Sequence, residues 1–260
     1  MIEINPTDAK PPVTEAARAD VTALALRQKR ANGLLMKVVN FAGGQVEDGL
    51  KLLPKAMRGQ IETAVRSALL RSYELAARSR RGGVLRSDRA HRVIGTLSGA
   101  LGGLGGLPTA LAELPVATTL IFRAVQGVAA QYGEDPLSPE TRLECLRVFG
   151  AGGPGAADDG IDTSFIGARI SITGPALGKI ISKVAPRFGA VLSQKLLTQA
   201  VPIIGAAAGA GTNYAFVDYY IEMAHVHFGL RKVARDHGAG PVADVFHAAL
   251  MDAKLAKQRD

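Results

Sequence analysis

The chain has 260 residues, of which 47% are hydrophobic and 21% charged, which is ordinary usage for a globular protein. This composition excludes a disordered tail protein, a collagen-like repeat and a small disulfide scaffold, and the length suits one large domain or two small ones. The formal net charge is +8, glycine reaches 30 residues and tryptophan is absent. The single cysteine, Cys145, excludes an intramolecular disulfide and fits a reducing compartment.

The N-terminal residues 1–12 are polar and predict a flexible tail ahead of one helical domain over residues 13–260. Because the tail lacks the basic and then apolar pattern of a signal peptide, we expect a cytoplasmic protein. A first helix is predicted over about residues 14–39, and it is expected to end near Gly43 and Gly44.

The second predicted helix runs from about Pro54 to Arg78, because apolar residues recur there at helical spacing and proline suits a first helical turn. Most charged residues of this segment lie off the apolar stripe. The net charge lies in this part of the chain: residues 1–95 hold 17 Lys and Arg against 9 Asp and Glu, whereas residues 96–260 hold 14 of each. The first third therefore carries the whole excess of positive charge.

A basic amphipathic helix followed by an arginine-rich loop suits anionic lipid headgroups, or phosphates in general. The alternative is an ordinary solvated helix face with a basic loop. Nucleic acid is not expected as a partner, because no aromatic residues interleave with the arginines and no recognisable nucleic-acid module surrounds them. The candidate membrane or phosphate contacts are Arg66, Arg71, Arg78, Arg80, Arg81 and Arg86.

Helical periodicity continues along the rest of the chain, and no convincing strand pattern is present. A third helix is predicted to begin near residues 87–88, and another to follow Pro115 and end near Gly133. Ser138, followed by Pro139, predicts the start of a helix that leads to Phe149. Further helices are predicted near residues 163–184, 188–200, 203–236 and 241–257, with a break at 238–241. The expected fold class is an all-α, glycine-rich multi-helix bundle.

Two segments, residues 93–112 and 196–217, carry no charge and are each long enough to cross a bilayer. Their glycine, proline and polar residues argue against simple membrane spans. Glycines recur at helical spacing in and between these segments, at Gly95, Gly99, Gly102 and Gly106, at Gly174 and Gly178, and at Gly205 and Gly209. Such glycine faces allow two helices to approach closely. The alternative is a glycine-walled apolar cleft that takes an acyl chain.

Two phosphate-binding motifs are matched in part and rejected. Residues 150–155 match the dinucleotide fingerprint, but a predicted helix precedes them where the motif requires a strand. Residues 174–180 are one residue short of a phosphate loop and lack the Ser or Thr that would hold magnesium. No cofactor is therefore expected. Cys145 has no histidine within reach along its helix, and we interpret it as a small core residue.

A polar set in the C-terminal third suggests a metal site as one alternative. Asp218, Glu222 and His225 are spaced by four and three residues, which places them on one helical face. Residues 222–225 form the Glu-x-x-His element of carboxylate-bridged di-metal bundles, but the sequence offers no second such element. The other interpretation is a capped or paired polar face.

Residues 114–123 (LPVATTLIFR), followed by 132–135 (YGED), resemble the central signature of the EcsC family. Residues 201–205 (VPIIG), followed by Gly209, Asn213, Ala224, His227, Phe228 and Arg231, are similar to its second signature, so that the resemblance covers about residues 50–250. Glu113 stands where the signature has Asp. The resemblance implies a helical, often membrane-associated protein and supplies no catalytic residues. It marks as candidate functional groups Thr118, Thr119, Arg123, Asn213, His227 and Arg231, each of which could equally serve to cap, pair or satisfy the bundle interior.

The leading interpretation is a non-enzymatic, amphitropic helical protein that binds lipid or another apolar ligand at an anionic membrane surface, peripheral to its inner face. One alternative is an adaptor that docks on a membrane transporter, and another is a metal-dependent enzyme built on Asp218, Glu222 and His225. The candidate pocket residues are Gly99, Gly102, Gly106, Thr118, Thr119, Arg123, Gly205, Gly209 and Asn213. The sequence leaves the ligand, the partner and the oligomeric state open.

Overall fold

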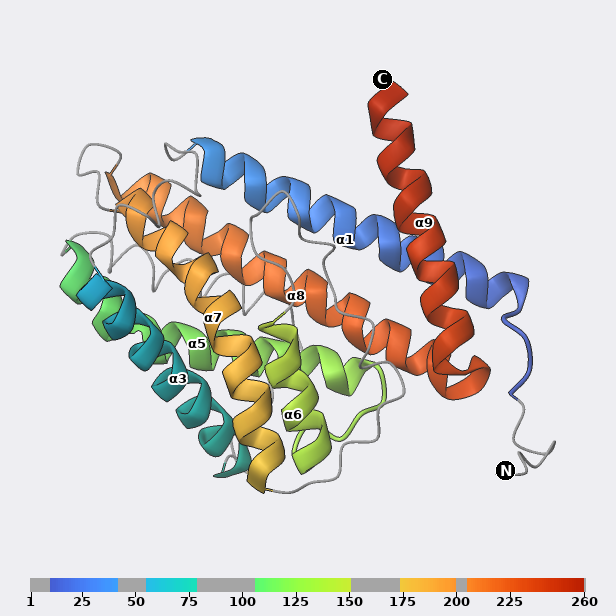
Figure 1. Ribbon diagram of the computed structural model, residues 1–260, viewed down its shortest axis with the longest axis horizontal. Coiled ribbons are helices and arrows are strands. Elements are labelled where there is room, and N and C mark those ends of the chain that lie inside the picture. The colour runs from blue at the N-terminus through green and yellow to red at the C-terminus, as the bar shows by residue number, and fades with distance from the viewer. Residues whose placement is uncertain (1–9, 42–54, 79–105, 151–173, 200–204, 260) are drawn as a thin grey trace.

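The computed structural model describes residues 10–41, 55–78, 106–150, 174–199 and 205–259. Within these ranges every regular element is an α-helix, which confirms the predicted all-α fold (Figure 1). The helices are, in chain order, α1 (Glu15–Phe41), α3 (Lys55–Arg78), α5 (Gly106–Gln131), α6 (Pro139–Val148), α7 (Gly174–Gln199), α8 (Gly205–His237) and α9 (Ala239–Arg259).

The central helix is α8, which contacts α1, α5, α6 and α9. Every residue of α8 from Tyr219 to Leu230 is buried except Glu222. In Figure 1, α8 runs beside α1, while α3, α5, α6 and α7 lie on its other side and the end of α9 projects from the body. A helix that is buried on nearly all sides needs apolar residues around its circumference, as this part of the sequence provides.

An aromatic cluster joins three of these helices through Phe149, the residue that follows α6. The ring centroid of Phe149 lies 4.9 Å from that of Phe188 on α7 and 5.2 Å from that of Tyr220 on α8. Phe122 on α5 stacks on the same ring at 6.1 Å. All four side chains are essentially inaccessible to solvent. The end of α6 is therefore held in the core.

The predicted start of α6 is confirmed in its details. Ser138 is the N-cap, and its Oγ accepts a hydrogen bond from the backbone N–H of Thr141 at 3.1 Å. Pro139 is the first helical residue, where its missing N–H costs nothing. The bounds of α1, α3, α8 and α9 also lie close to those predicted, because periodicity and glycine breaks mark them in the sequence.

Two predicted helix boundaries are wrong because the helices continue through proline. Pro115 lies inside α5, which already begins at Gly106, and Pro186 lies inside α7, where two helices were predicted. Each proline removes one helical hydrogen bond. Both helices pack against α3, and this tertiary contact outweighs the local loss.

The predicted break near residue 238 narrows to Gly238 alone, whose φ of +86° only glycine adopts without strain. Lys10 reaches this corner: its Nζ donates to the carbonyl oxygens of Ala234, at 3.3 Å, and of Arg235. These carbonyls lie at the end of α8, where helical partners are lacking. Residues 10–12 of the predicted tail thus lie beside the helical body, and residues 1–9 lie outside the described ranges.

Close packing through glycine occurs at a position that the sequence analysis did not single out. A Cβ added to Gly229 on α8 would lie 2.8 Å from Cδ1 and 2.9 Å from Cδ2 of Leu24 on α1. Gly178, for which close packing was predicted, is exposed and has open space where a Cβ would lie, so that prediction is wrong. The proposed face at Gly95, Gly99 and Gly102 lies outside the described residues.

Of the two uncharged segments, 93–112 is described only from Gly106 and 196–217 lacks residues 200–204. The described helices include none that combines the length and the apolar character of a membrane span. The third predicted helix, from residues 87–88, also lies outside the described ranges.

Candidate functional site

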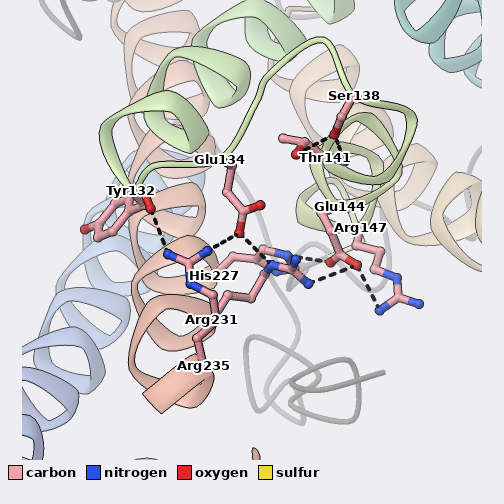
Figure 2. A network of polar contacts seen from close by, with 9 residues as sticks. All are labelled: Tyr132, Glu134, Ser138, Thr141, Glu144, Arg147, His227, Arg231 and Arg235. Atoms are coloured by element: carbon pink, nitrogen blue, oxygen red, sulfur yellow. Dashed lines mark hydrogen bonds and ion pairs between the residues drawn. The ribbon is translucent and has the colours of Figure 1, made fainter. Parts of the chain in front are cut away.

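A group of charged side chains gathers between α6 and α8 (Figure 2). We call it the ionic cluster, and it consists of Glu134, Glu144, Arg147, His227, Arg231 and Arg235. α6 supplies Glu144 and Arg147, and α8 supplies the histidine and the other two arginines at one-turn intervals. Glu134 comes from the connection after α5. Three segments of the chain therefore meet in one polar site.

Glu144 and His227 form the buried centre of the ionic cluster. Nε2 of His227 lies 2.9 Å from Oε2 of Glu144, and each side chain is only 2% exposed. The other carboxylate oxygen, Oε1, lies 3.3 Å from Nη1 of Arg231 and 3.6 Å from Nη1 of Arg147. Both oxygens of this buried carboxylate therefore face donors.

The environment keeps Glu144 charged and His227 neutral. Burial raises the pKa of Glu144, but the hydrogen bond from His227 and the positive charges of Arg231 and Arg147 together lower it more. Burial is also the largest influence on the pKa of His227, and burial together with the positive charges of Arg231 and Arg147 lowers that pKa by more than the contact with Glu144 raises it. Because a carboxylate only accepts, Nε2 of the neutral imidazole carries the proton and donates it.

Glu134 extends the ionic cluster toward the surface. Its Oε1 accepts from Nε of Arg231 at 3.3 Å and from Nη1 of Arg235 at 2.9 Å. Arg235 also donates from Nη2 to the carbonyl oxygen of Tyr132 at 3.0 Å. The Tyr132 hydroxyl lies 3.2 Å from Nδ1 of His225. The end of α5 is thus tied to α8 by several polar contacts.

The ionic cluster unites the two segments that carried the family resemblance. Glu134 and Arg231 are 97 positions apart in the chain, and each lies in one of those segments. The candidates His227 and Arg231 are thereby placed in one polar site. Glu144, Arg147 and Arg235 were not predicted as site residues. The signal that could have found Glu144 and Arg147 is the number of charged residues in the short helix α6, whose residues 141–146 are all buried.

The chemistry of the ionic cluster is that of an electrostatic clamp. Each of its carboxylates faces at least two cationic or N–H donors. Cys145 is adjacent and fully buried, and burial together with the negative charges of Glu144 and Glu134 raises the pKa of its thiol well above the ordinary value. The thiol is therefore protonated and unreactive, which agrees with its interpretation as a core residue.

The three residues of the predicted metal site are not brought together as ligands. Glu222 pairs with Arg27 on α1, whose Nε and Nη2 donate to its two carboxylate oxygens. His225 faces the hydroxyl of Tyr132. Within the part of the chain that the structure describes, no three His, Cys, Asp or Glu side chains are arranged to hold a metal ion. Asp218 is half-buried on the same helix.

The predicted pocket residues fall in several places. Thr118 is buried and its Oγ1 has no hydrogen-bond partner among the described residues, whereas Oγ1 of Thr119 donates to the carbonyl oxygen of Pro115 at 2.7 Å. Arg123 is half-buried on α5. Gly106 begins α5 and Gly205 begins α8. Gly209 and Asn213 lie in α8, where the structure describes only their backbone. Gly99 and Gly102 lie outside the described residues.

A second candidate site is an exposed face that we call the α3–α5 surface, which consists of Arg66, Leu70, Arg71, Leu75 and Val116. The aliphatic members are unusually accessible, at 38% for Leu70, 45% for Leu75 and 58% for Val116. The two helices are joined by Oγ of Ser72 and Oγ1 of Thr119, which lie 3.2 Å apart. Leu75 follows Ser72 by one turn and Val116 precedes Thr119 by one turn.

A shallow depression also lies on α3. Its volume is about 580 Å³, and it is lined by Gly59, Gln60, Thr63, Ala64 and Ser67. Of the predicted phosphate contacts, Arg66 and Arg71 are exposed here, with Nε of Arg66 lying 3.5 Å from Oε1 of Glu62. Arg78 is the last residue of α3, and its side chain is not described. Arg80, Arg81 and Arg86 lie outside the described residues.

Comparison with known proteins gives one result. The family model described as the EcsC protein family matches residues 28–160 and 162–233. This match covers most of the chain and includes every member of the ionic cluster except Arg235. No curated protein and no solved structure matches the chain.

Proposed function

Because the chain belongs to the EcsC protein family, we propose that it is a non-enzymatic helical protein that binds reversibly to an anionic membrane surface through the α3–α5 surface. The observation that carries this proposal is the exposure of three large aliphatic side chains on two helices in contact, one of which, α3, also exposes Arg66 and Arg71. Exposed apolar side chains flanked by basic ones are the pattern of helices that lie in the membrane interface.

The residues of α3 divide into two faces. Val65, Ala68 and Leu69 are buried against the rest of the bundle. Leu70 projects from the opposite face, and Arg66 and Arg71 flank it around the helix. This leaves a leucine at the centre of the outward face, with a guanidinium on either side. The arrangement would let Leu70 enter the acyl boundary while the two arginines remain at the level of the headgroups.

The distribution of charge favours an anionic partner. The net charge of +8 lies in the first third of the chain, which includes α3. Each Lys or Arg near an anionic bilayer adds about 1 kcal/mol of attraction. A few partly exposed aliphatic side chains add an apolar contribution that is too small for permanent insertion. The expected binding is therefore reversible and sensitive to salt.

In this proposal the ionic cluster has a supporting role. It fixes α6 and the end of α5 to α8, and α5 carries Val116 of the α3–α5 surface. The Ser72–Thr119 contact sets the position of α3 against α5. A membrane-binding face needs such a rigid base, because a mobile one would lose ordering entropy at each encounter.

Vesicle flotation tests the proposal. The purified protein would be mixed with neutral phosphatidylcholine vesicles and with vesicles that also contain phosphatidylserine, and we expect a much larger fraction of it to float with the anionic ones. The double variant Arg66→Glu and Arg71→Glu should lose this binding. The matched control, Arg18→Glu and Arg30→Glu, makes the same change of charge at exposed positions on α1 and should still bind.

Equal recovery with both kinds of vesicle, or equal loss in the control variant, would contradict the electrostatic part of the proposal. Failure to float with any vesicle would contradict the proposal as a whole and would favour an adaptor that needs a membrane protein as its partner.

A further inference from the structure

Arg142 on α6 is a nearly buried arginine, only 9% exposed, whose charge is not balanced by any carboxylate among the described residues. Its Nη1 donates to the carbonyl oxygen of Tyr73 on α3 at 3.0 Å, and its guanidinium carbon lies 4.3 Å from the centroid of the Tyr73 ring. Its Nε is fully buried and has no hydrogen-bond partner among the residues that the structure describes. Within the described ranges, the bond to Tyr73 is the one hydrogen bond that its guanidinium makes.

The edge of Arg142 that lacks a partner is the one that binds two oxygens at once. Nε and Nη2 of a guanidinium point the same way and form a fork that fits a carboxylate or a phosphate. Arg27 uses this same edge here, because its Nε and Nη2 donate to the two oxygens of Glu222. Arg27 is 30% exposed at its side chain. The more buried arginine is thus the one whose fork is empty.

Neither of the two acidic residues nearest in sequence forms a described ion pair with Arg142, and the first of them, Glu140, is exposed in the first turn of α6. Glu144 is directed to the other side of α6, where its oxygens face His227, Arg231 and Arg147. The stacking of Arg142 on the Tyr73 ring and its single hydrogen bond offset part of the cost of removing the cation from water. A buried charge without a counter-charge remains costly, and an oxyanion at the fork would remove that cost.

We infer that Arg142 and Tyr73 form a binding site for a phosphate group, whose oxygens accept from Nε and Nη2 of the guanidinium. The site lies where α6 meets α3, and Tyr73 is close in the chain to Leu70 and Arg71 of the α3–α5 surface. An anionic phospholipid headgroup or a free phosphate would supply the same chemistry. The inference deepens the proposed function by naming where one headgroup is held, and it rests on that function only for the lipid source.

Calorimetric titration of the full chain at constant ionic strength tests this inference. The probes are inorganic phosphate, dihexanoyl phosphatidic acid below its micellar concentration, and dihexanoyl phosphatidylcholine as the zwitterionic comparison. We expect a phosphate probe to bind the wild-type chain. Arg142→Lys keeps the charge but removes the fork, and Arg142→Gln removes both, so each should weaken binding roughly tenfold to a hundredfold. Arg27→Lys, whose fork is already filled, should bind as the wild type does.

The source of the phosphate follows from the probes. Binding of phosphatidic acid but not of inorganic phosphate supports a lipid headgroup, and equal binding of both supports a free phosphate. The inference is overturned if the wild type binds neither, or if Arg142→Lys binds as tightly as the wild type. If Arg142→Gln does not fold, the comparison of Arg142→Lys with the wild type is sufficient to test the inference.

The titration contains no bilayer, so its outcome is separate from that of flotation. Phosphate binding in the titration with failed flotation would support the Arg142 site and contradict the membrane proposal. Flotation with anionic vesicles without phosphate binding would support the membrane proposal and contradict the Arg142 site.

Discussion

His227 on α8 donates from Nε2 to Oε2 of Glu144 on α6 across 2.9 Å, and each of these side chains is only 2% exposed. A carboxylate in such a place is stable only if both oxygens find donors. Arg231 and Arg147 supply the second set of contacts. This pair therefore forms only when α6 and α8 are packed as in the folded protein, so its loss should be measurable as a loss of stability.

Replacement of Glu144 by Gln should destabilise the protein by about 3 kcal/mol, because removal of one partner leaves buried cations without a counter-charge. Urea unfolding at pH 7.5 measures the difference in the free energy of unfolding. Glu62→Gln is the matched control, since the Glu62–Arg66 pair is exposed and should contribute less than about 1 kcal/mol. Equal effects of the two substitutions would contradict the clamp.

The stability should fall as the pH is lowered below 6.5. The pKa of His227 in the folded protein lies below its ordinary value of 6.5, so the unfolded chain binds a proton first as the pH falls. The pKa of Glu144 also lies below its ordinary value, of 4.5, and its contribution is present above that value and lost at lower pH. Both groups therefore lower the free energy of unfolding as the pH falls, and the contribution of His227 is lost at a higher pH than that of Glu144.

Urea unfolding between pH 5 and pH 7.5 measures this dependence. His227→Gln, which keeps a donor for Glu144, should reduce the slope of unfolding free energy against pH between about 5 and 6.5. His247→Gln, at an exposed position on α9, is the matched control variant. A slope that does not respond to His227→Gln would show that another group titrates there.

Gly229→Ala should destabilise the protein by about 1–2 kcal/mol, because the new methyl group would overlap Leu24 across the α1–α8 contact. Gly178→Ala should instead stabilise it by up to about 1 kcal/mol, since alanine is the better helix former and the space is open. Thermal or urea unfolding measures both. If the overlap is the cause, Leu24→Ala should remove most of the penalty of Gly229→Ala.

The apolar part of membrane binding should survive high salt. At about 0.5 M salt the Debye length is near 4 Å, so that the arginines contribute little. The residual binding of the wild type to anionic vesicles should then fall in the double variant Leu70→Asn and Val116→Asn, with little further change in Arg66→Glu and Arg71→Glu. Flotation at two salt concentrations measures this. Complete loss of wild-type binding at high salt would leave no role for the aliphatic side chains.

The elements that the sequence predicted well are those set by neighbouring residues. Ser138 and Pro139 start α6 because the hydroxyl and the missing N–H act within one turn. Pro115 and Pro186 led to wrong boundaries, because the local cost of a proline is visible in the sequence and the compensating contact with α3 is not. Gly229 was missed for the same reason: its neighbour, Leu24, lies on another helix.

The sequence by itself determined the all-α class, most helix bounds, the location of the positive charge and the membership of the EcsC family. Only the tertiary structure decided that Glu222 pairs with Arg27 instead of joining a metal site, and that Glu144 meets His227. Helix periodicity depends on hydrogen bonds and side chains a few residues apart, so it can be read along the chain. The partner of a buried charge depends on which helices pack together, and that arises from the burial of apolar surface over the whole bundle.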